Sequence, residues 1–247
     1  MTRTKELALT PVEPDQGADD PGSWTDGPRA APRASGIRPR DAANPLEVAG
    51  VHRAFKGRGE VLKGLSFTAQ EGDRIALTGP NGSGKSTLLR CIAGSMKPTA
   101  GTITVYDHPA GSVAARDLIG VSLSQERSFY LRLTCEQNLA YFANLRRDLP
   151  DRAKDHVKAI VKEIAIEDFA RQRVDRCSTG MVQQLTFARA LLGDPKVLLL
   201  DEPTRSLDKN AVERLWAALD RRPECIVVIA THREEDVARC GTHIDLT

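Results

Sequence analysis

Short runs of apolar residues alternate along the chain with longer segments whose apolar positions recur every three or four residues. The runs at 74–78, 197–200 and 225–230 have the length and composition of buried strands. The segments 180–191 and 210–219 repeat with the period of an α-helix. Strands that alternate with helices predict a mostly parallel sheet covered on both faces. The expected fold class is therefore α/β.

The remaining segments complete this pattern. Regular structure is expected to begin at about residue 46, because residues 1–45 are rich in Pro, Asp, Arg, Gly and Ala and predict a disordered extension. Residues 46–247 then form one domain. Further strands are expected near 61–69, 101–106 and 119–124, with a helix after residue 87 and a last helix over 234–240.

A helical block interrupts the alternation between residues 135 and 173. Its apolar positions are spaced by three and four residues, which indicates helices rather than strands. Pro150 separates two expected helices, and Asp151 is a candidate cap for the second. A block of helices between strands predicts an inserted helical subdomain, at about residues 126–178.

Composition narrows the setting in which the chain works. Lys plus Arg (35) nearly balances Asp plus Glu (33), so charge gives no reason to expect a nucleic-acid partner. The five cysteines show no C-x-x-C spacing, which is typical of reduced thiols rather than of disulfides or zinc. We find no apolar stretch near the roughly 18 residues of a membrane span and no secretion signal. We expect a cytosolic chain that reaches a membrane only through a partner.

Residues 79–87 read Gly-Pro-Asn-Gly-Ser-Gly-Lys-Ser-Thr, a full match to the loop G-x-x-x-x-G-K-[ST] between an expected strand and an expected helix. The glycines let backbone amides turn toward one anion, and the helix dipole adds to their attraction. Lys85 is expected to reach the β- and γ-phosphates, and the Ser86 hydroxyl to ligate Mg²⁺. A plain structural turn is the alternative. The expected nucleotide-binding residues are Gly79, Pro80, Asn81, Gly82, Ser83, Gly84, Lys85, Ser86 and Thr87.

Two carboxylates follow the apolar run 197–200. Because the end of this buried strand should lie beside the phosphate loop, Asp201 is expected to hold Mg²⁺, directly or through water. Glu202 is expected to orient or deprotonate the attacking water. Taken alone, acidic surface residues at a strand end are the alternative. Together with the loop at 79–87, it predicts hydrolysis of a nucleoside triphosphate.

Four further segments resemble, in the same order, the nucleotide-binding subunit of ATP-binding cassette (ABC) transporters. The resemblance runs from about residue 46 to the C-terminus and implies a P-loop NTPase fold of ABC type. That architecture has a mostly parallel core sheet, a small antiparallel β subdomain and an inserted helical subdomain. The matching segments are 123–126 with Gln125, 177–185 with Ser178 and Gly180, 206–208 with Asp208, and 229–232 with His232.

The resemblance assigns roles to these positions. Gln125 would serve Mg²⁺ and join Lys85, Glu202 and His232 in the catalytic set, with His232 on the γ-phosphate. An ordinary loop glutamine and a structural histidine are the alternatives. Mg²⁺ would then be held by Ser86, Gln125 and Asp201.

Other positions would hold the nucleotide itself. Phe55 stands where the family often has a tyrosine, and its ring would stack on adenine, a core position being the alternative. Ser178, Gly180 and Asp208 would contact ATP bound to a second copy of the chain, although Ser178 also suits a plain helix N-cap. Two copies would therefore pair head to tail around two molecules of MgATP.

The chain also departs from the family pattern. Cys177, Thr179 and Met181 replace the usual Leu, Gly and Gln of the signature. The Ser-Thr-Gly-Met variant and residues 126–139 resemble the drug and polysaccharide export branch. Because the chain ends at Thr247, soon after His232, the last edge of the fold is expected to be missing or altered.

The resemblance implies an exporter ATPase with a transmembrane permease as partner, no nucleic acid, and a peripheral place on the cytoplasmic face of the membrane. A soluble ABC ATPase that acts on the ribosome or DNA is the main alternative. The single cassette, and the roughly 50 residues between Gln125 and Ser178 that leave no room for a long coiled coil, count against it. A P-loop kinase would share residues 79–87 but would need neither the signature nor His232.

Overall fold

The computed structural model describes residues 44–57, 59–123, 129–147, 149 and 152–247. The chain divides into two units, residues 1–30 and 31–247. The first unit lies outside the described residues, so the description below concerns the second. The expected disordered extension therefore falls almost entirely outside the described residues, as do Pro150 and Asp151.

A small antiparallel sheet opens the described part of the chain. Its strand order is β2-β1-β4-β5, and β1 pairs with both β2 and β4. Leu46 at the start of β1 lies opposite Ala69 on one side and Val105 on the other, and all three side chains are buried. The strands are β1 (Leu46–Phe55), β2 (Gly59–Ala69), β4 (Ala100–Val105) and β5 (His108–Pro109).

A second sheet of five strands is parallel throughout, in the order β6-β7-β8-β3-β9. The α/β class with a parallel core and a small antiparallel sheet is thus confirmed. The strands are β3 (Arg74–Thr78), β6 (Ile119–Ser122), β7 (Val197–Asp201), β8 (Ile226–Ala230) and β9 (Thr242–Asp245).

Strand β9 corrects the expectation that the last edge of the fold is missing or altered. It pairs with β3 over Ile75–Thr242 to Thr78–Asp245 and closes that side of the sheet. The sequence did not predict this strand because Ile244 is its only aliphatic residue, and the other three side chains are exposed. An edge strand buries too little apolar surface to give a strand-like pattern.

Helices fill the segments between the strands. The helical block holds three helices and a 3₁₀ turn where two helices were expected, because Ala165 has a positive φ of 51° and ends α4 early. Helix α2 was not expected. The helices are α1 (Lys85–Ile92), α2 (Val113–Leu118), α3 (Cys135–Leu145), α4 (Ala153–Glu163), α5 (Glu167–Ala170), η1 (Val174–Arg176), α6 (Thr179–Ala190), α7 (Lys209–Asp220) and α8 (Glu234–Val237).

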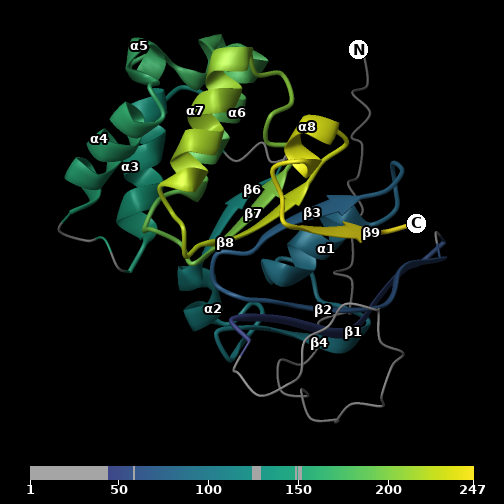
Figure 1. Ribbon diagram of the computed structural model, residues 1–247. Helices are drawn as coiled ribbons and strands as arrows, with labels where there is room; N and C mark the ends of the chain where they lie inside the picture. The colour runs from purple at the N-terminus through teal and green to yellow at the C-terminus, as the bar shows by residue number, and fades with distance from the viewer. Residues whose placement is uncertain (1–43, 58, 124–128, 148, 150–151) are drawn as a thin grey trace, which may run out of the picture. The chain divides into compact units, whose positions relative to one another are not determined.

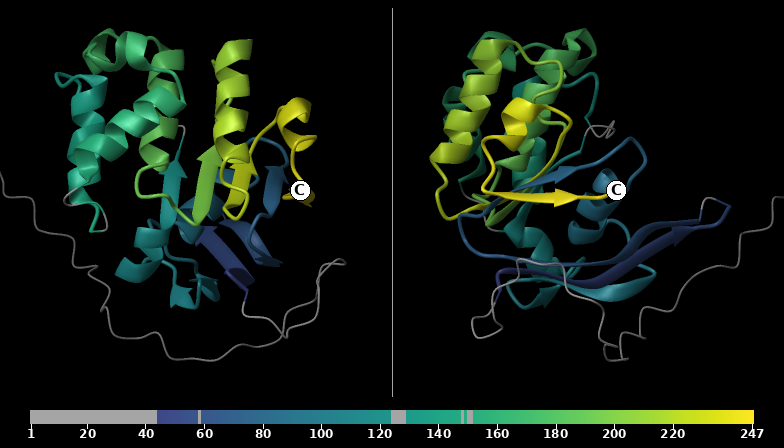
Figure 2. Two further views of the ribbon diagram at one scale, coloured as in Figure 1. Left: turned by 60° about the vertical axis from the view of Figure 1, so that its left-hand side comes forward. Right: turned by 45° about the vertical axis from the view of Figure 1, so that its right-hand side comes forward.

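The parallel sheet separates two hydrophobic cores. Because successive side chains of a strand point to opposite faces, Leu198 and Leu200 pack into the core formed with helices α3–α7. Val197 and Leu199 pack into the core formed with α1 and the antiparallel sheet. Figure 1 and the turned views of Figure 2 show the parallel sheet between these two layers. In the described part of the chain, no helix is both long and apolar enough to cross a bilayer.

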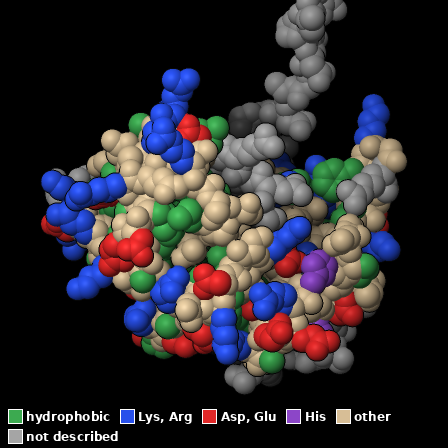
Figure 3. Space-filling view, turned by 90° about the horizontal axis from the view of Figure 1, so that it is seen from above, with side chains coloured by type: hydrophobic (Ala, Val, Ile, Leu, Met, Phe, Trp, Pro, Cys, Tyr) green, Lys and Arg blue, Asp and Glu red, His purple; other side chains and the backbone are tan. Residues whose placement is uncertain are grey.

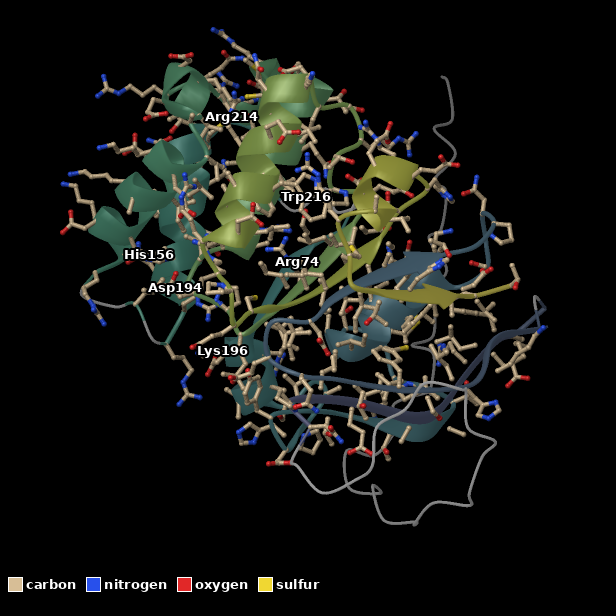
Figure 4. The ribbon with its side chains drawn as sticks, in the orientation of Figure 1. Arg74, His156, Asp194, Lys196, Arg214 and Trp216 are labelled. Atoms are coloured by element: carbon tan, nitrogen blue, oxygen red, sulfur yellow. The ribbon has the colours of Figure 1, made fainter. Side chains whose placement is uncertain are left out.

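Helix α7 is fastened to the parallel sheet through Trp216, whose side chain is buried (Figure 4). The guanidinium of Arg74 on β3 lies 5.9 Å from the ring centroid, and that of Arg239 lies 5.2 Å from it. Arg74 also pairs with Asp220 at the end of α7, at 2.8 Å. Stacking of cations on a buried indole holds α7 against the parallel sheet.

Candidate functional site

The predicted chemistry gathers at one edge of the parallel sheet. Strands β7, β8 and β3 are neighbours and run in the same direction, so their carboxyl ends open on a common edge. The phosphate loop leaves β3, Glu202 follows β7 and His232 follows β8. Gln125, predicted to serve Mg²⁺, belongs to the loop after β6 and lies outside the described residues.

The loop at 79–84 turns directly into α1. Gly79, Gly82 and Gly84 have φ values of 124°, 87° and 110°, which residues with a side chain rarely adopt. A Cβ at Gly84 would also lie 2.8 Å from Leu62 Cδ2, so a side chain there would displace Leu62. The antiparallel sheet, through Leu62 of β2, thus fixes the position of the loop.

Two polar groups of this loop are set for an anion. Lys85, the first residue of α1, is 7% exposed, and its Nζ donates to the carbonyl oxygens of Gly79 (2.6 Å) and Pro80 (3.0 Å). The Ser83 Oγ atom is buried without a hydrogen-bond partner. A buried hydroxyl without a partner is costly, so it fits a ligand that supplies one. Among the neighbouring residues, Ser86 and Thr87 are partly buried, and Pro80 and Asn81 are exposed.

The carboxylates and the histidine meet beside this loop. Asp201 is the last residue of β7 and is 4% exposed. The Glu202 side chain is 14% exposed, and its Oε1 lies 3.2 Å from His232 Nε2. That contact is close enough for an ion pair, but its angles are not those of a hydrogen bond, since Oε1 makes none. The structure therefore brings Glu202 and His232 together; their roles stay predictions.

The environment of Glu202 suits a group that takes up a proton. Burial raises the pKa of its carboxyl above the ordinary value, and the charge of Asp201 acts in the same direction. His232 and Lys85 oppose this rise. Because the folded state disfavours the charged carboxylate, the pKa moves toward neutrality, where a general base is most effective.

The predicted second half of the site lies elsewhere on the chain. Ser178 is the N-cap of α6, and its hydroxyl accepts a hydrogen bond from Met181 N at 3.2 Å. Asp208 caps α7 in the same way, through Ala211 N at 2.8 Å. Ser178, Gly180 and Asp208 line one pocket of about 580 Å³, and none of the phosphate-loop residues that the structure describes lines it.

Gly180 joins the two parts of this second half. A Cβ at this position would lie 2.7 Å from the Ser206 carbonyl oxygen, so only glycine lets the start of α6 approach that loop. Ser206 itself has a positive φ of 65°. The backbones of the signature segment and of the loop before α7 are therefore fitted to each other.

Phe55 is the last residue of β1 and is half-buried. The Arg53 guanidinium lies 4.8 Å from its ring centroid. The Phe55 ring thus lies at the end of β1, an inner strand of the antiparallel sheet, with a cation over it.

Comparison with known proteins decides the family. A family model described as ABC transporter matches residues 62–205. The chain belongs to the ABC transporter family. Its cassette is that of an ABC-type ATPase.

Curated ABC relatives extend over most of the chain. Nod factor export ATP-binding protein I of Rhizobium sp. (strain N33) is 37% identical over 199 residues, 78% of this chain and 64% of that protein. ABC transporter ATP-binding protein NatA of Bacillus subtilis is 33% identical over 200 residues, 78% of this chain and 81% of that protein. ATP-binding cassette sub-family A member 9 of Homo sapiens is 36% identical over 180 residues. This chain spans 11% of that human protein, and less than two thirds of the Nod factor protein.

Solved ABC structures share the fold. The ATP-binding cassette MJ0796, in a dimeric post-hydrolysis state bound to ADP and Pi, matches with a TM-score of 0.73 at 24% identity, over 82% of this chain and 94% of that one. CbiO1 from Clostridium perfringens, part of the ABC transporter complex cbiONQ, matches with a TM-score of 0.69 at 26% identity, over 83% and 85%. The P-loop NTPase fold of ABC type predicted from the sequence is confirmed.

The structure also shows residues of this ABC cassette that the sequence reading missed. Gln183 on α6 donates from Nε2 to the carbonyl oxygens of Glu202 and Pro203, both at 3.3 Å. Glu202 has a positive φ of 50°, a strained conformation that such contacts hold in place. The sequence feature that could have indicated Gln183 is its position, three residues after Gly180 on a helix that packs into the core.

A buried carboxylate fixes the loops on either side. Asp236 on α8 is 1% exposed, and its Oδ2 accepts hydrogen bonds from the hydroxyls of Thr204 and Thr231, the latter at 3.1 Å. Thr204 belongs to the loop after Glu202, and Thr231 directly precedes His232. One carboxylate therefore holds both loops. The spacing of these residues along the sequence does not predict this role.

Proposed function

We propose that the chain hydrolyses ATP as one half of a head-to-tail pair and thereby powers an exporter. The observation that carries the proposal is the separation of two half-sites on one chain. Lys85, Glu202 and His232 lie at the sheet edge, whereas Ser178 and Gly180 line a pocket without any described phosphate-loop residue. Two copies related by a two-fold axis would complete both sites, each copy supplying the half that the other needs.

Each residue has a distinct part in the proposed reaction. The loop amides and Lys85 bind the β- and γ-phosphates, which the buried Ser83 hydroxyl also suits. Ser86 and Asp201, with Gln125, would supply oxygen ligands of the kind Mg²⁺ prefers, and the ion would supply positive charge against the phosphates when bound. The described residues hold no cluster of three carboxylate, histidine or cysteine ligands, in keeping with an ion held partly by substrate phosphates.

Glu202 then acts as the general base. Its raised pKa leaves a carboxylate that takes a proton from the attacking water, while Gln183 holds its backbone in place. His232, 3.2 Å away, faces the same space and contacts the γ-phosphate. In the paired state, the amino end of α6 in the other copy adds a partial positive charge to that phosphate. ATP therefore binds the paired state better than the separate chains, and hydrolysis reverses this preference.

An exposed apolar surface supports the proposal that the partner is a transmembrane permease. Tyr130, Leu131, Tyr141 and Leu145 are 48%, 59%, 40% and 63% exposed, and we call this set the docking patch. The Tyr130 and Tyr141 rings meet edge to face, with centroids 4.7 Å apart. An exposed cluster of this kind marks an interaction site, here for a cytoplasmic helix of a permease. The name of the Nod factor export relative supports the direction of transport.

Basic side chains on the same helical block support a position at the inner face of the membrane. Lys154, Lys158 and Lys162 on α4 are exposed, as is Arg171 after α5. Figure 3 shows Lys and Arg side chains, interspersed with Asp and Glu, at the end of the molecule that carries these helices. Cations near a membrane surface are attracted by anionic headgroups. The proposed partners do not include a nucleic acid.

Glu202→Gln tests the catalytic assignment. Removing a general base is expected to lower the ATPase rate by roughly 10²–10⁴-fold, while ATP binding is kept. The variant should then remain as an ATP-bound pair in size-exclusion chromatography with light scattering. Glu213→Gln, which removes an exposed carboxylate on α7, is the control and should behave as the native chain. A Glu202→Gln variant that turns over at the native rate contradicts the assignment.

Co-purification with a polytopic membrane protein from solubilised membranes tests the exporter assignment.

A further inference from the structure

Two cysteines distant in the sequence are in contact in the fold. The Sγ atoms of Cys135 and Cys177 lie 3.5 Å apart, and both residues are free thiols. Cys225 and Cys240 instead donate to the backbone carbonyls of Pro195 and Asp236. The sequence predicts only isolated reduced thiols, since 42 positions separate this pair.

The pair joins two helix starts. Cys135 is the first residue of α3, directly after the N-cap Thr134. Cys177 directly precedes Ser178, the N-cap of the signature helix α6. The backbones already run side by side here, because Cys135 N donates to Gln172 O at 3.0 Å and Thr134 pairs with Arg173. A disulfide bond of about 2 Å requires the two sulfur atoms, now 3.5 Å apart, to move together.

The same stretch leads to the docking patch. Val174 N donates to Leu133 O and Asp175 N to Leu131 O, at 3.1 and 3.0 Å. Leu131 belongs to the docking patch, and residues 174–177 lead into the signature. The two cysteines thus lie between the surface assigned to the permease and the half-site assigned to ATP.

We propose that Cys135 and Cys177 form a thiol-oxidation site, which a low-molecular-weight disulfide closes into a protein disulfide that slows ATP turnover. The bond would tie the docking-patch segment to the start of α6. A half-site that must move against its neighbours during a cycle is slowed when such a tie holds it. The effect on turnover rests on the proposed ATPase function, whereas disulfide formation does not.

The exposure of the two thiols sets the order of steps. Cys177 is partly exposed and Cys135 is fully buried. The Cys177 thiolate attacks one sulfur of the small disulfide, forms a mixed disulfide and releases one small thiolate. The Cys135 sulfur gives its proton to solvent, attacks the Cys177 sulfur and releases the second thiolate. The two protein thiols lose two electrons and two protons, and the small disulfide is reduced to two thiols.

Burial also sets the speed of the second step. It raises the pKa of the Cys135 thiol to about 12, and the hydrogen bond with Cys177 adds to this rise. The thiolate of Cys135 is therefore scarce at neutral pH, and closure should become faster as the pH rises. In a reducing compartment the pair stays as two thiols and closes only when small disulfides accumulate.

The test uses the full chain with cystamine as the oxidant. After proteolysis, mass spectrometry is expected to find the Cys135 and Cys177 peptides joined. The ATPase rate should fall at least about threefold and recover when dithiothreitol is added. Cys240→Ser, which removes another partly buried thiol, should respond as the native chain does. Cys135→Ser and Cys177→Ser should each lose the joined peptide, with each variant compared with itself before and after oxidant. Cys135→Ala serves if the buried serine prevents folding.

The outcomes separate the two parts of the proposal. Absence of the joined peptide in the native chain overturns the oxidation site. A joined peptide with an unchanged ATPase rate overturns the link to turnover. If the reduced chain has no ATPase activity under any condition, the proposed function fails, while the joined peptide still decides the oxidation site.

Discussion

The two half-sites of this chain are held by different structural elements. The half with Glu202 and His232 lies at the ends of buried parallel strands. Its loops are held by the Gln183 amide, which donates hydrogen bonds, and by the Asp236 carboxylate, which accepts them. The half with Ser178 and Gly180 stands on the amino end of one helix, and Ser178 and Thr179 are exposed. The first half has its donors and acceptors fixed before any partner arrives, whereas the second presents free helix-end amides to solvent.

This difference suits the first half-site to positioning a catalytic base and the second to sensing the partner copy. A base must be held within a fraction of an ångström, which buried strands and satisfied polar groups achieve. A helix end at the surface binds an anion weakly on its own, because water competes for the same amides. In the proposed pair, the signature half would therefore become effective only when a second copy brings its phosphate. The three predictions below test whether the halves are divided in this way.

Mixing two inactive variants gives the largest expected change. Lys85→Ala disables the catalytic half and Gly180→Arg the signature half, so each chain alone should be inactive. In an equal mixture about half of the pairs are mixed, and each mixed pair keeps one intact site of two, so about a quarter of the native rate should return. Steady-state phosphate release measures it. A mixture that stays inactive contradicts sharing of sites between chains.

Gly180→Ala tests the signature half alone. The added Cβ would lie 2.7 Å from the Ser206 carbonyl oxygen, so the loop before α7 must shift. We expect the ATPase rate to fall by about tenfold, with ATP affinity of the separate chain unchanged because the phosphate loop is untouched. Gly241→Ala, whose Cβ would meet nothing within 4 Å, is the matched control. Equal rates for the two variants would show that the fit to Ser206 is unimportant.

Gln183→Leu tests the catalytic half with the smallest expected change. Without the amide, the carbonyls of Glu202 and Pro203 lose their donor, and the strained backbone of Glu202 is less firmly held. We expect kcat to fall several-fold, at most about tenfold, with KM nearly constant because no phosphate contact is lost. Gln70→Leu, which removes a partly buried amide on the antiparallel-sheet side, should leave both constants unchanged. A rise in KM with constant kcat would place Gln183 in nucleotide binding instead.

The sequence predicted those parts of the molecule that depend on short stretches of chain. The loop at 79–87 and the run 197–200 carry their own pattern, so strand, loop and helix could be placed at their true positions. The place of Glu202 at the end of a buried strand followed from the run 197–200, whereas the role of His232 came only from the family resemblance. Exposed edge strand β9 and short helix α2 were missed because they bury too little apolar surface to impose a period.

Contacts that join distant segments could not be predicted. Gln183 and Glu202 are 19 positions apart, and Cys135 and Cys177 are 42 apart. Each pair depends on how α6 and α3 pack, which no local pattern states. The roles of Gln125, and of the residues assigned to ATP and Mg²⁺, remain predictions from the family resemblance together with the geometry described above.

The carboxylate of Asp236 has a consequence for motion in the cassette. Because Thr204 and Thr231 share this single acceptor, a displacement that reaches either loop is passed to the other. The carboxylate proposed to activate water and the imidazole proposed to contact the γ-phosphate are then expected to advance and withdraw in step. Their spacing would stay constant while the rest of the protein opens and closes around them.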